Sequence, residues 1–360
     1  MWTMLLGLLA MPSADACVAL VTRDGGALAT SEAQQVILEA TATGSVVEYA
    51  NEYTGAAEDF GWIIVVPAPF VSMEDGDIAR FEALAELSQP RVQITSVGGD
   101  DGSAGCGCGG AMKGDGAALG GLDSGANMVD IVAEGFTGSY GYTVVESDDA
   151  DGLSAWLGDN GWVLGPNEAA LTEYVNEGGF AFVLVDLAPT AALGSGEARM
   201  LPPVRIASGS TDLMFPARMA RDAAPEFQNT RIYVLGNEEA NVTGWSAVEL
   251  GWIEVNGGES PENAYENALW DATSDSSTYV RVFSDATAHG WLTRFETRAD
   301  RDVHTTDPYF TLDGGHEPLE TVVDQWARST PTVSASWLMV GLGLPLVVVV
   351  RGRRRRAGQG

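Results

Sequence analysis

The C-terminal end carries the feature that most constrains this chain, an uncharged apolar segment that runs into a cluster of arginines. Thr332–Val350 reads TVSASWLMVGLGLPLVVVV, and RGRRRR follows directly. As an α-helix with a rise of about 1.5 Å per residue, this segment would measure roughly 28 Å, close to the thickness of a bilayer's hydrocarbon core. Clustered arginines stay on the cytoplasmic side of such a helix. We therefore expect a transmembrane helix over 332–350, contact with the membrane through it, and an Arg-rich cytoplasmic tail over 351–360.

The tail also resembles bacterial C-terminal sorting signals, in which a short apolar helix and its arginines are removed by a membrane protease. Those signals carry a recognition motif before the helix, which in one class includes a cysteine. No cysteine lies near residue 332 in this chain. Stable anchoring is the preferred interpretation, and removal of the helix after sorting stays open as the alternative.

The N-terminal end predicts export. Met4–Met11 is an apolar run too short to span a bilayer, and Ala14-Asp15-Ala16 supplies the small-x-small pattern of a signal-peptidase site. Residues 1–16 are thus expected to be a signal peptide, although its first residues contain no Lys or Arg. Cleavage would leave Cys17 as the first mature residue. Lipid attachment to Cys17 is the alternative, but that processing usually requires Leu where Ala14 stands.

The charge of the chain is strongly acidic. Nineteen basic residues against fifty acidic ones give a net charge of −31, and five of the arginines belong to the C-terminal tail. Such a field repels nucleic acid and anionic lipid and attracts cations. We therefore expect no nucleic-acid partner. Solubility or adaptation to salty surroundings explains the acidity more simply than specific calcium binding does.

The region between the two ends predicts an α+β ectodomain, because strands and short helices alternate without a regular βαβ order. Residues 17–97 are rich in strand patterns, and 98–127 form a Gly/Asp-rich loop or linker. Residues 128–330 make up the α+β remainder. Strands are expected at Gln35–Leu38, Ser45–Tyr53, Gly61–Pro67, Arg91–Val97, Tyr140–Val145, Phe180–Leu187 and Arg231–Leu235.

Five helices are expected from apolar periodicity and capping residues. Asp77 would cap a helix through about Ser88, with Ile78, Phe81, Leu84 and Ala85 on one face. Ser147, Asp148 or Asp149 would cap a helix that buries Leu153, Trp156 and Leu157 and ends at Asn160-Gly161. The remaining three helices are Glu168–Glu177, Pro261–Asp271 with Ser260 as its cap, and Leu319–Ala327.

Three cysteines are the most reactive side chains of the chain. In an exported protein, Cys106-Gly107-Cys108 could form a strained disulfide, or one of the two could pair with Cys17. A structural disulfide with one spare thiol is the preferred interpretation. A thiol-redox or metal-handling role for Cys17, Cys106 and Cys108 is the alternative.

No other pattern points to a defined chemistry. His289, His304 and His316 lack metal-ligand spacing, and we expect them to be solvated surface residues. Asp148–Gly152 looks like a calcium loop but lacks the EF-hand register, so capping explains its acids better. Neither a nucleophile elbow, a phosphate-binding loop nor a dinucleotide fingerprint is present in register. The sequence therefore predicts no metal site, no cofactor and no catalytic residue, and an enzyme is the less favoured reading.

Four separated motifs carry a family resemblance. The stretch Glu52–Pro69 (EYTGAAEDFGWIIVVPAP) is similar to the Y-x-G-x-x-x-D-F-x-W-hydrophobic-P-x-P signature of an uncharacterised bacterial exported family, number 2330 among the domains of unknown function. The segments WLGDNGW at 156–162, YVNEGGF at 174–180, and Leu201-Pro202-Pro203 leading to Phe215–Arg218 agree in order. Gly61 before Trp62, and one extra hydrophobic residue before Pro67, depart from the pattern.

The resemblance implies a signal peptide, a cysteine near the mature N-terminus and often a C-terminal membrane segment, but no established activity. The motif residues are expected to be structural: Tyr53, Gly55, Asp59, Phe60, Trp62, Pro67, Pro69, Trp156, Asn160, Gly161 and Arg218. Asp59 and Arg218 need partners, because a charge beside buried aromatics is costly without one. The expected function is a single-pass cell-membrane protein with its ectodomain outside the cytoplasm, which binds a cell-envelope or protein partner and is not an enzyme.

Overall fold

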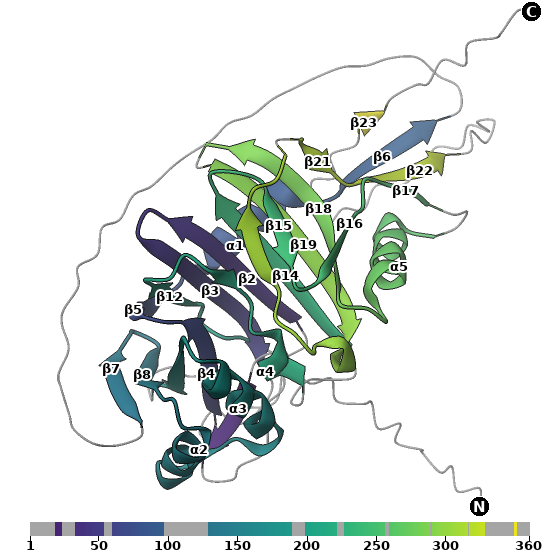
Figure 1. The fold of residues 1–360 in the computed structure, drawn as a ribbon. Coiled ribbons are helices and arrows are strands. Elements are labelled where there is room, and N and C mark those ends of the chain that lie inside the picture. Colours follow the sequence, from purple (N-terminus) through teal and green to yellow (C-terminus); the bar gives the residue numbers. More distant parts are fainter. Residues whose placement is uncertain are drawn as a thin grey trace, which may run out of the picture.

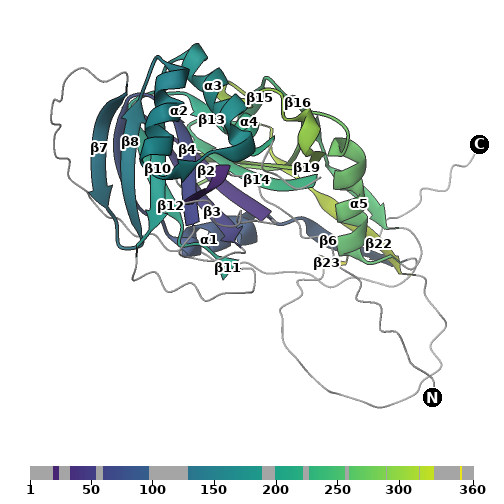
Figure 2. The same cartoon turned by 90° about the horizontal axis from the view of Figure 1, so that it is seen from below.

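The computed structural model describes residues 19–23, 33–53, 60–96, 129–188, 199–221, 227–255, 259–288, 290–315, 317–327 and 349–350. These residues form four layers: two helices, a six-stranded sheet, a ten-stranded sheet and two further helices (Figures 1 and 2). The fold is therefore mixed α+β and rich in strands, in agreement with the expected class.

The six-stranded sheet has the order β7-β8-β10-β4-β1-β9. Its strands are β7 (Asp130–Phe136), β8 (Tyr140–Glu146), β10 (Phe180–Leu187), β4 (Phe60–Pro67), β1 (Ala19–Arg23) and β9 (Trp162–Val163). Every described side chain of β4 from Gly61 to Pro67 is buried, because β4 lies between β10 and β1 and is covered on both faces. This explains the continuous apolar run in its sequence.

The ten-stranded sheet follows the order β16-β18-β19-β14-β2-β3-β12-β5, with β11 beside β3 and β21 beside β18. Its strands are β16 (Ser246–Glu249), β18 (Thr278–Thr287), β19 (Gly290–Asp300), β14 (Phe227–Gly236), β2 (Ala33–Thr41), β3 (Gly44–Tyr53), β12 (Val204–Ser208), β5 (Phe70–Asp75), β11 (Arg199–Met200) and β21 (Leu319–Glu320). Strands β14 and β2 pair in parallel although almost two hundred residues separate them.

Two smaller sheets complete the strand inventory. One joins β13 (Leu213–Met214), β20 (Tyr309–Leu312) and β15 (Ala240–Thr243). The other joins β17 (Trp252–Val255), β22 (Val322–Ala327), β6 (Arg91–Ser96) and β23 (Val349–Val350). Strands from both sides of 98–127 thus share sheets, since β6 pairs with β22 and β4 pairs with β10.

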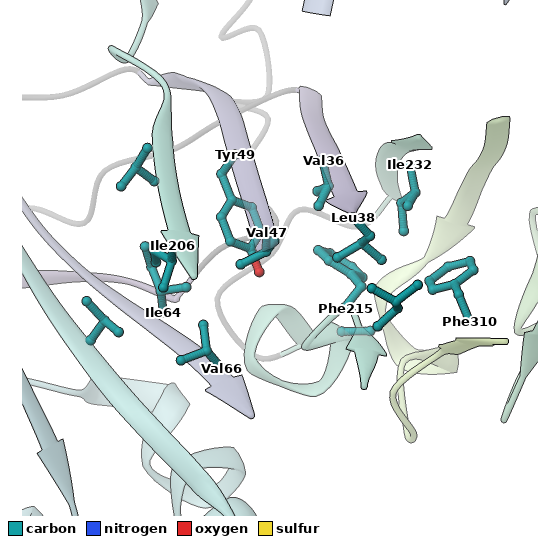
Figure 3. Packing of buried hydrophobic residues seen from close by; sticks show 14 of the residues in the cluster. Val36, Leu38, Val47, Tyr49, Ile64, Val66, Ile206, Phe215, Ile232 and Phe310 are labelled. Atoms are coloured by element: carbon teal, nitrogen blue, oxygen red, sulfur yellow. The ribbon is translucent and has the colours of Figure 1, made fainter. Parts of the chain in front are cut away.

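The main core fills the space between the two large sheets (Figure 3). Val36, Leu38, Val47 and Tyr49 of β2 and β3 face Ile64 and Val66 of β4, and Phe215 and Phe310 close one side. Helices α2 (Ala150–Asp159) and α3 (Glu168–Glu177) cover the outer face of the six-stranded sheet. Helices α1 (Ile78–Ser88) and α5 (Pro261–Thr273) cover the outer face of the ten-stranded sheet. The short helix α4 (Ala217–Arg221) lies near α3.

The expected strands and the first four helices are present, and their caps explain why. Asp77 accepts a hydrogen bond from the backbone N–H of Ala79 at the start of α1, and Ser260 caps α5 in the same manner. Gly161 and Gly178 adopt positive φ angles after α2 and α3. Within α1, Phe81 is buried, but Ile78 is exposed and does not belong to the buried face.

The helix expected at Leu319–Ala327 is wrong. These residues form β21 and β22, and β22 pairs in parallel with β17 and β6. Thr321, Val322 and Val323 are all buried, because both faces of β22 are covered. A strand of this kind has consecutive apolar residues, whose spacing also fits one face of a helix.

The two terminal segments lie mostly outside the described residues. Of the expected transmembrane segment 332–350, only Val349 and Val350 are described, and they form β23 beside β6. The expected signal peptide 1–16, the 98–127 segment and the 351–360 tail are not among the described residues. Among the helices that are described, none combines the length and apolar character needed to cross a membrane.

Candidate functional site

Arg218 lies at the centre of a charged cluster, which we call the Arg218 clasp and define as Arg218, Asp307, Tyr174 and Glu177. The first three residues are buried, and Glu177 is exposed. The Nε of Arg218 donates to Oδ2 of Asp307 at 2.9 Å, and its Nη2 donates to Oε2 of Glu177 at 2.7 Å. The guanidinium carbon lies 4.2 Å from the centre of the Tyr174 ring. The clasp therefore ties α4 to helix α3 and to the segment before β20.

The oxygens of Asp307 are all occupied within the clasp. Oδ1 accepts hydrogen bonds from the Tyr174 hydroxyl at 2.8 Å and from the backbone N–H of Arg218 at 3.0 Å, and Oδ2 accepts from the guanidinium. This arrangement satisfies a buried carboxylate that would otherwise be costly. The partner that the sequence required for Arg218 is thus Asp307, supported by Glu177.

The electrostatics of the clasp favour the charged form of Glu177 and the neutral form of Tyr174. The hydrogen bond from Arg218 is the main reason why the pKa of Glu177 is below its ordinary value. Burial, together with the charge of Asp307, raises the pKa of the Tyr174 hydroxyl well above its ordinary value. Neither the Glu177 carboxyl nor the Tyr174 phenol is therefore poised for proton transfer near neutral pH.

The other motif residues lie in several separate places. Trp62 is buried on β4 and meets the Tyr49 ring edge to face at a centroid distance of 5.7 Å. Pro67 ends β4, and Pro69 follows through a cis peptide bond. Trp156 is half-buried on α2, and its carbonyl accepts a hydrogen bond from the Asn160 side chain at 2.8 Å. These residues do not converge on a common site with Arg218.

Several predicted site residues lie outside the described part. Gly55, Asp59, Cys17, Cys106, Cys108, His289 and His316 are in this group. Tyr53 is the last residue of β3, and Phe60 is the first residue of β4. The structure describes only the backbone of these two residues. The cysteine-centred interpretation and the need of Asp59 for a partner therefore remain predictions.

His304 is buried, which corrects its expected place on the surface. Only 1% of the residue is exposed, and neither ring nitrogen has a hydrogen-bond partner among the described residues. The ring lies 5.1 Å from the Trp245 ring, and Trp245 is held by a 2.7 Å bond from Nε1 to the Thr306 carbonyl. Burial lowers the pKa of His304 to about 4, against a smaller opposing effect of Asp300. The acidic sequence around His304 suggested solvent, but the segment folds inward.

The structure contains two further charged networks that were not predicted from the sequence. On the helix-covered face of the ten-stranded sheet, Glu296 accepts hydrogen bonds from Arg231 at 2.6 Å and from the Tyr265 hydroxyl at 2.8 Å, and it pairs with Arg294. Burial would raise the pKa of Glu296, but the two arginines outweigh it and hold the pKa below its ordinary value. The alternating charges of TRFETRAD at 293–300 are the signal that could have indicated this strand.

The second network lies beneath α1. Arg80 on α1 donates to Glu39 at 2.6 Å and to the buried Glu48 at 3.0 Å, and Arg205 on β12 contacts the same two carboxylates. These contacts span four elements, so no local sequence pattern could have predicted them. Like the Arg218 clasp, both networks pair their charges internally.

The best-formed cavity among the described residues offers little room for a small ligand. It lies between the two large sheets, has a volume of about 10 Å³ and is lined mostly by apolar residues such as Leu38, Val66 and Ile206. A space of that size holds about one water molecule. No group of three or more metal-ligating side chains occurs among the residues that the structure describes.

Comparison with known proteins bears out the resemblance found in the motifs. The family model described as "Uncharacterized protein conserved in bacteria (DUF2330)" matches residues 11–308. No curated protein matches the chain. The crystal structure of baculovirus P35 aligns with 82% of this chain and 97% of its own, at 10% identity and a TM-score of 0.30. A likeness that weak supports no conclusion about fold or function.

Proposed function

The chain belongs to the bacterial family DUF2330, and on that premise we propose that it is an exported, membrane-anchored protein of the cell envelope that binds a partner and performs no catalysis. The observation that weighs against catalysis is the closure of the Arg218 clasp. Among the described motif residues, only Arg218 carries a charge, and its guanidinium already donates hydrogen bonds to Asp307 and Glu177. A substrate would find no unpaired group there.

The proposed location is supported by the two ends of the sequence. An apolar run and a small-x-small site begin the chain, and a 332–350 apolar segment followed by arginines ends it. Insertion of 332–350 into a bilayer requires the two residues of β23 to leave their place beside β6. The pairing covers only Val349 and Val350, so little is lost by giving it up.

The location is tested with alkaline phosphatase fused after residue 330 or after residue 360, since this enzyme is active only outside the cytoplasm. We expect activity from the first fusion and none from the second. Deleting residues 1–16 should abolish the activity, and ending the chain at residue 330 should release it from the membrane fraction. Full-length chain in the soluble cytoplasmic fraction would disprove the proposal.

A second candidate function rests on Cys106-Gly107-Cys108 in an exported chain. A strained disulfide between these neighbours would be easily reduced and could exchange thiols with a partner, and reduced thiolates could hold a soft metal. The test is a count of free thiols in the purified chain before and after mild reductant, together with metal analysis. A count that does not change, with no bound metal, would rule out this candidate.

A further inference from the structure

Residues 301–308 connect β19 to β20, and we call this segment the strap. It contains the short 3₁₀ helix Arg301–Val303 and no strand. In the described part of the chain, the backbone-to-backbone hydrogen bonds of residues 301–307 run only to other residues of the strap. The strap is therefore not part of a sheet, and it can move without breaking one.

Two polar side chains of the strap point inward and hold it in place. His304 and Asp307 are buried, whereas the four residues Arg301, Asp302, Thr305 and Thr306 are exposed. The His304 ring lies against Trp245, whose Nε1 also donates to the Thr306 carbonyl at 2.7 Å. Asp307 accepts its hydrogen bonds inside the Arg218 clasp. One short segment thus joins the His304 pocket to the clasp.

The His304 ring is enclosed without a group that could stabilise a positive charge by hydrogen bonding. Neither of its nitrogens has a hydrogen-bond partner among the described residues. The titratable and charged groups of the elements around it are Asp300, Arg301, Asp302 and Asp307 on its own segment, Arg218 and Arg221 on α4, and Tyr279 on β18 beside Trp245. Asp300 favours the imidazolium, but burial opposes it more strongly.

Acid therefore favours a strap that has left its place. A neutral imidazole can stay in the enclosed position, whereas an imidazolium loses its hydration there. Burial lowers the pKa of His304 to about 4, and the same ring in water has a pKa near 6.5. Between these two values, a proton binds the released strap and not the docked one, so a fall in pH shifts the population toward release.

Release of the strap also opens the clasp. Asp307 is three residues from His304, and Thr306 between them is bonded to Trp245, so the two side chains leave together. Arg218 keeps a counter-charge, because Glu177 at 2.7 Å and Glu173 at 3.6 Å both lie on α3. The freed Asp307 regains water. Opening the clasp in this way leaves no buried charge unpaired, which keeps its cost low.

We propose that the strap is an acid-sensitive latch on the Arg218 clasp. Protonation of His304 releases its ring from Trp245, and the strap withdraws Asp307 from Arg218 while both large sheets stay folded. The guanidinium of Arg218 and the hydroxyl of Tyr174 then face solvent as donors that no longer bond to Asp307. This inference goes beyond the proposed binding function and does not depend on it.

The test is hydrogen exchange followed by mass spectrometry on the purified full-length chain in detergent at pH 7, 6 and 5, with rates corrected for the intrinsic effect of pH. One readout is a peptide with the N–H groups of His304 and Thr305, which bond within the strap. The other is a peptide with the N–H of Arg218, which bonds to Oδ1 of Asp307 at 3.0 Å. We expect the protection of both to fall about twentyfold from pH 7 to pH 5.

Local release differs from global unfolding in the level of protection. At every pH, both readouts should be at least about a hundredfold less protected than the most protected amides of β14 and β19, which exchange only when the whole chain unfolds. Low urea concentrations should leave the exchange of the strap unchanged, because local release exposes little surface.

Variants assign the effect to one histidine. His304→Phe retains an aromatic ring that cannot be protonated, so the fall in protection with pH should disappear at both readouts. His304→Gln makes the same test with a polar uncharged side chain, and it serves if the Phe variant does not fold. The matched control is His289→Gln with His316→Gln, which removes the other two histidines of the chain and should keep the twentyfold fall.

Any of four results would overturn the inference. Protection of the strap equal to that of β14 and β19 would mean that His304 is reached only by global unfolding. A fall in the strap that the Arg218 peptide does not share would mean that the clasp stays closed. A fall that persists in both His304 variants would point to another group. No fall in the wild type would show that His304 does not control the strap.

Discussion

Buried charges that satisfy one another dominate this protein at the scale of single residues. Arg218 shows the principle most clearly, since Asp307 is almost fully buried and depends on the guanidinium for its solvation. The sequence could indicate that Arg218 needs a partner, because the motif places it beside aromatic residues. It could not indicate which of many carboxylates that partner is.

Removing the guanidinium should destabilise the fold strongly. We expect Arg218→Met to lower the free energy of unfolding by about 3–5 kcal/mol, because it leaves Asp307 buried without a counter-charge. Glu266→Gln is the matched control at the exposed Arg298–Glu266 pair, whose atoms are 3.5 Å apart, and should cost less than about 1 kcal/mol. Urea unfolding monitored by tryptophan fluorescence measures both. Equal losses would contradict the structural role of the clasp.

His304 should make the protein sensitive to acid. Its pKa is about 4 in the folded chain and near 6.5 when solvated, so between these values the unfolded chain binds a proton that the folded chain does not. Stability therefore falls as the pH falls through this window, by an amount on the order of 3 kcal/mol.

His304→Phe keeps a ring beside Trp245 and removes the titration. The measurement is the free energy of unfolding at several pH values between 4 and 7, compared as a difference between wild type and variant, because many carboxylates also titrate there. That difference should change with pH and level off above about 6.5. His304→Gln separates the loss of charge from the loss of polarity. A difference independent of pH would show that His304 is not the responsible group.

At the scale of elements, local signals located most helices, and capping gives a sharp contrast between two of them. Asp77 accepts a hydrogen bond from the N–H of Ala79 at 2.9 Å, whereas Asp149 begins α2 without any side-chain cap bond. We expect Asp77→Ala to cost about 1 kcal/mol and Asp149→Ala at most about 0.5 kcal/mol. Thermal unfolding followed by circular dichroism tests this, and the reverse order of losses would contradict it.

The strand at 322–327 shows where local signals fail. Its apolar residues fit a helical face as well as a strand, and the choice depends on β17 and β6, which lie about seventy and two hundred and thirty residues away in the sequence. Strands β18 and β19 gave no clear pattern either, because β19 carries buried charges at Arg294 and Glu296. Arg294 and Glu296 pair with each other on β19, and the further partners of Glu296, Arg231 and Tyr265, come from β14 and α5.

At the scale of the whole molecule, the net charge of −31 should oppose folding through self-repulsion. We expect the melting temperature to rise as sodium chloride is increased from low ionic strength, because salt screens this repulsion. Calcium chloride at equal ionic strength is the control. A similar rise with both salts indicates screening, and a rise at micromolar calcium would instead show a specific site.

Residues close together in the chain were enough to predict the family, the mixed class, seven of the strands and the caps of α1 and α5. Only the tertiary structure decided that β2 pairs with β14, that 319–327 is strand, that His304 is buried, and that Arg218 meets Asp307. Each of these contacts joins segments that are far apart in the sequence. Which segments pair is determined by the burial of apolar side chains in several sheets together. The place of β7 at the end of the described six-stranded sheet is of the same kind, since a strand is recognised as terminal only when its neighbours are known.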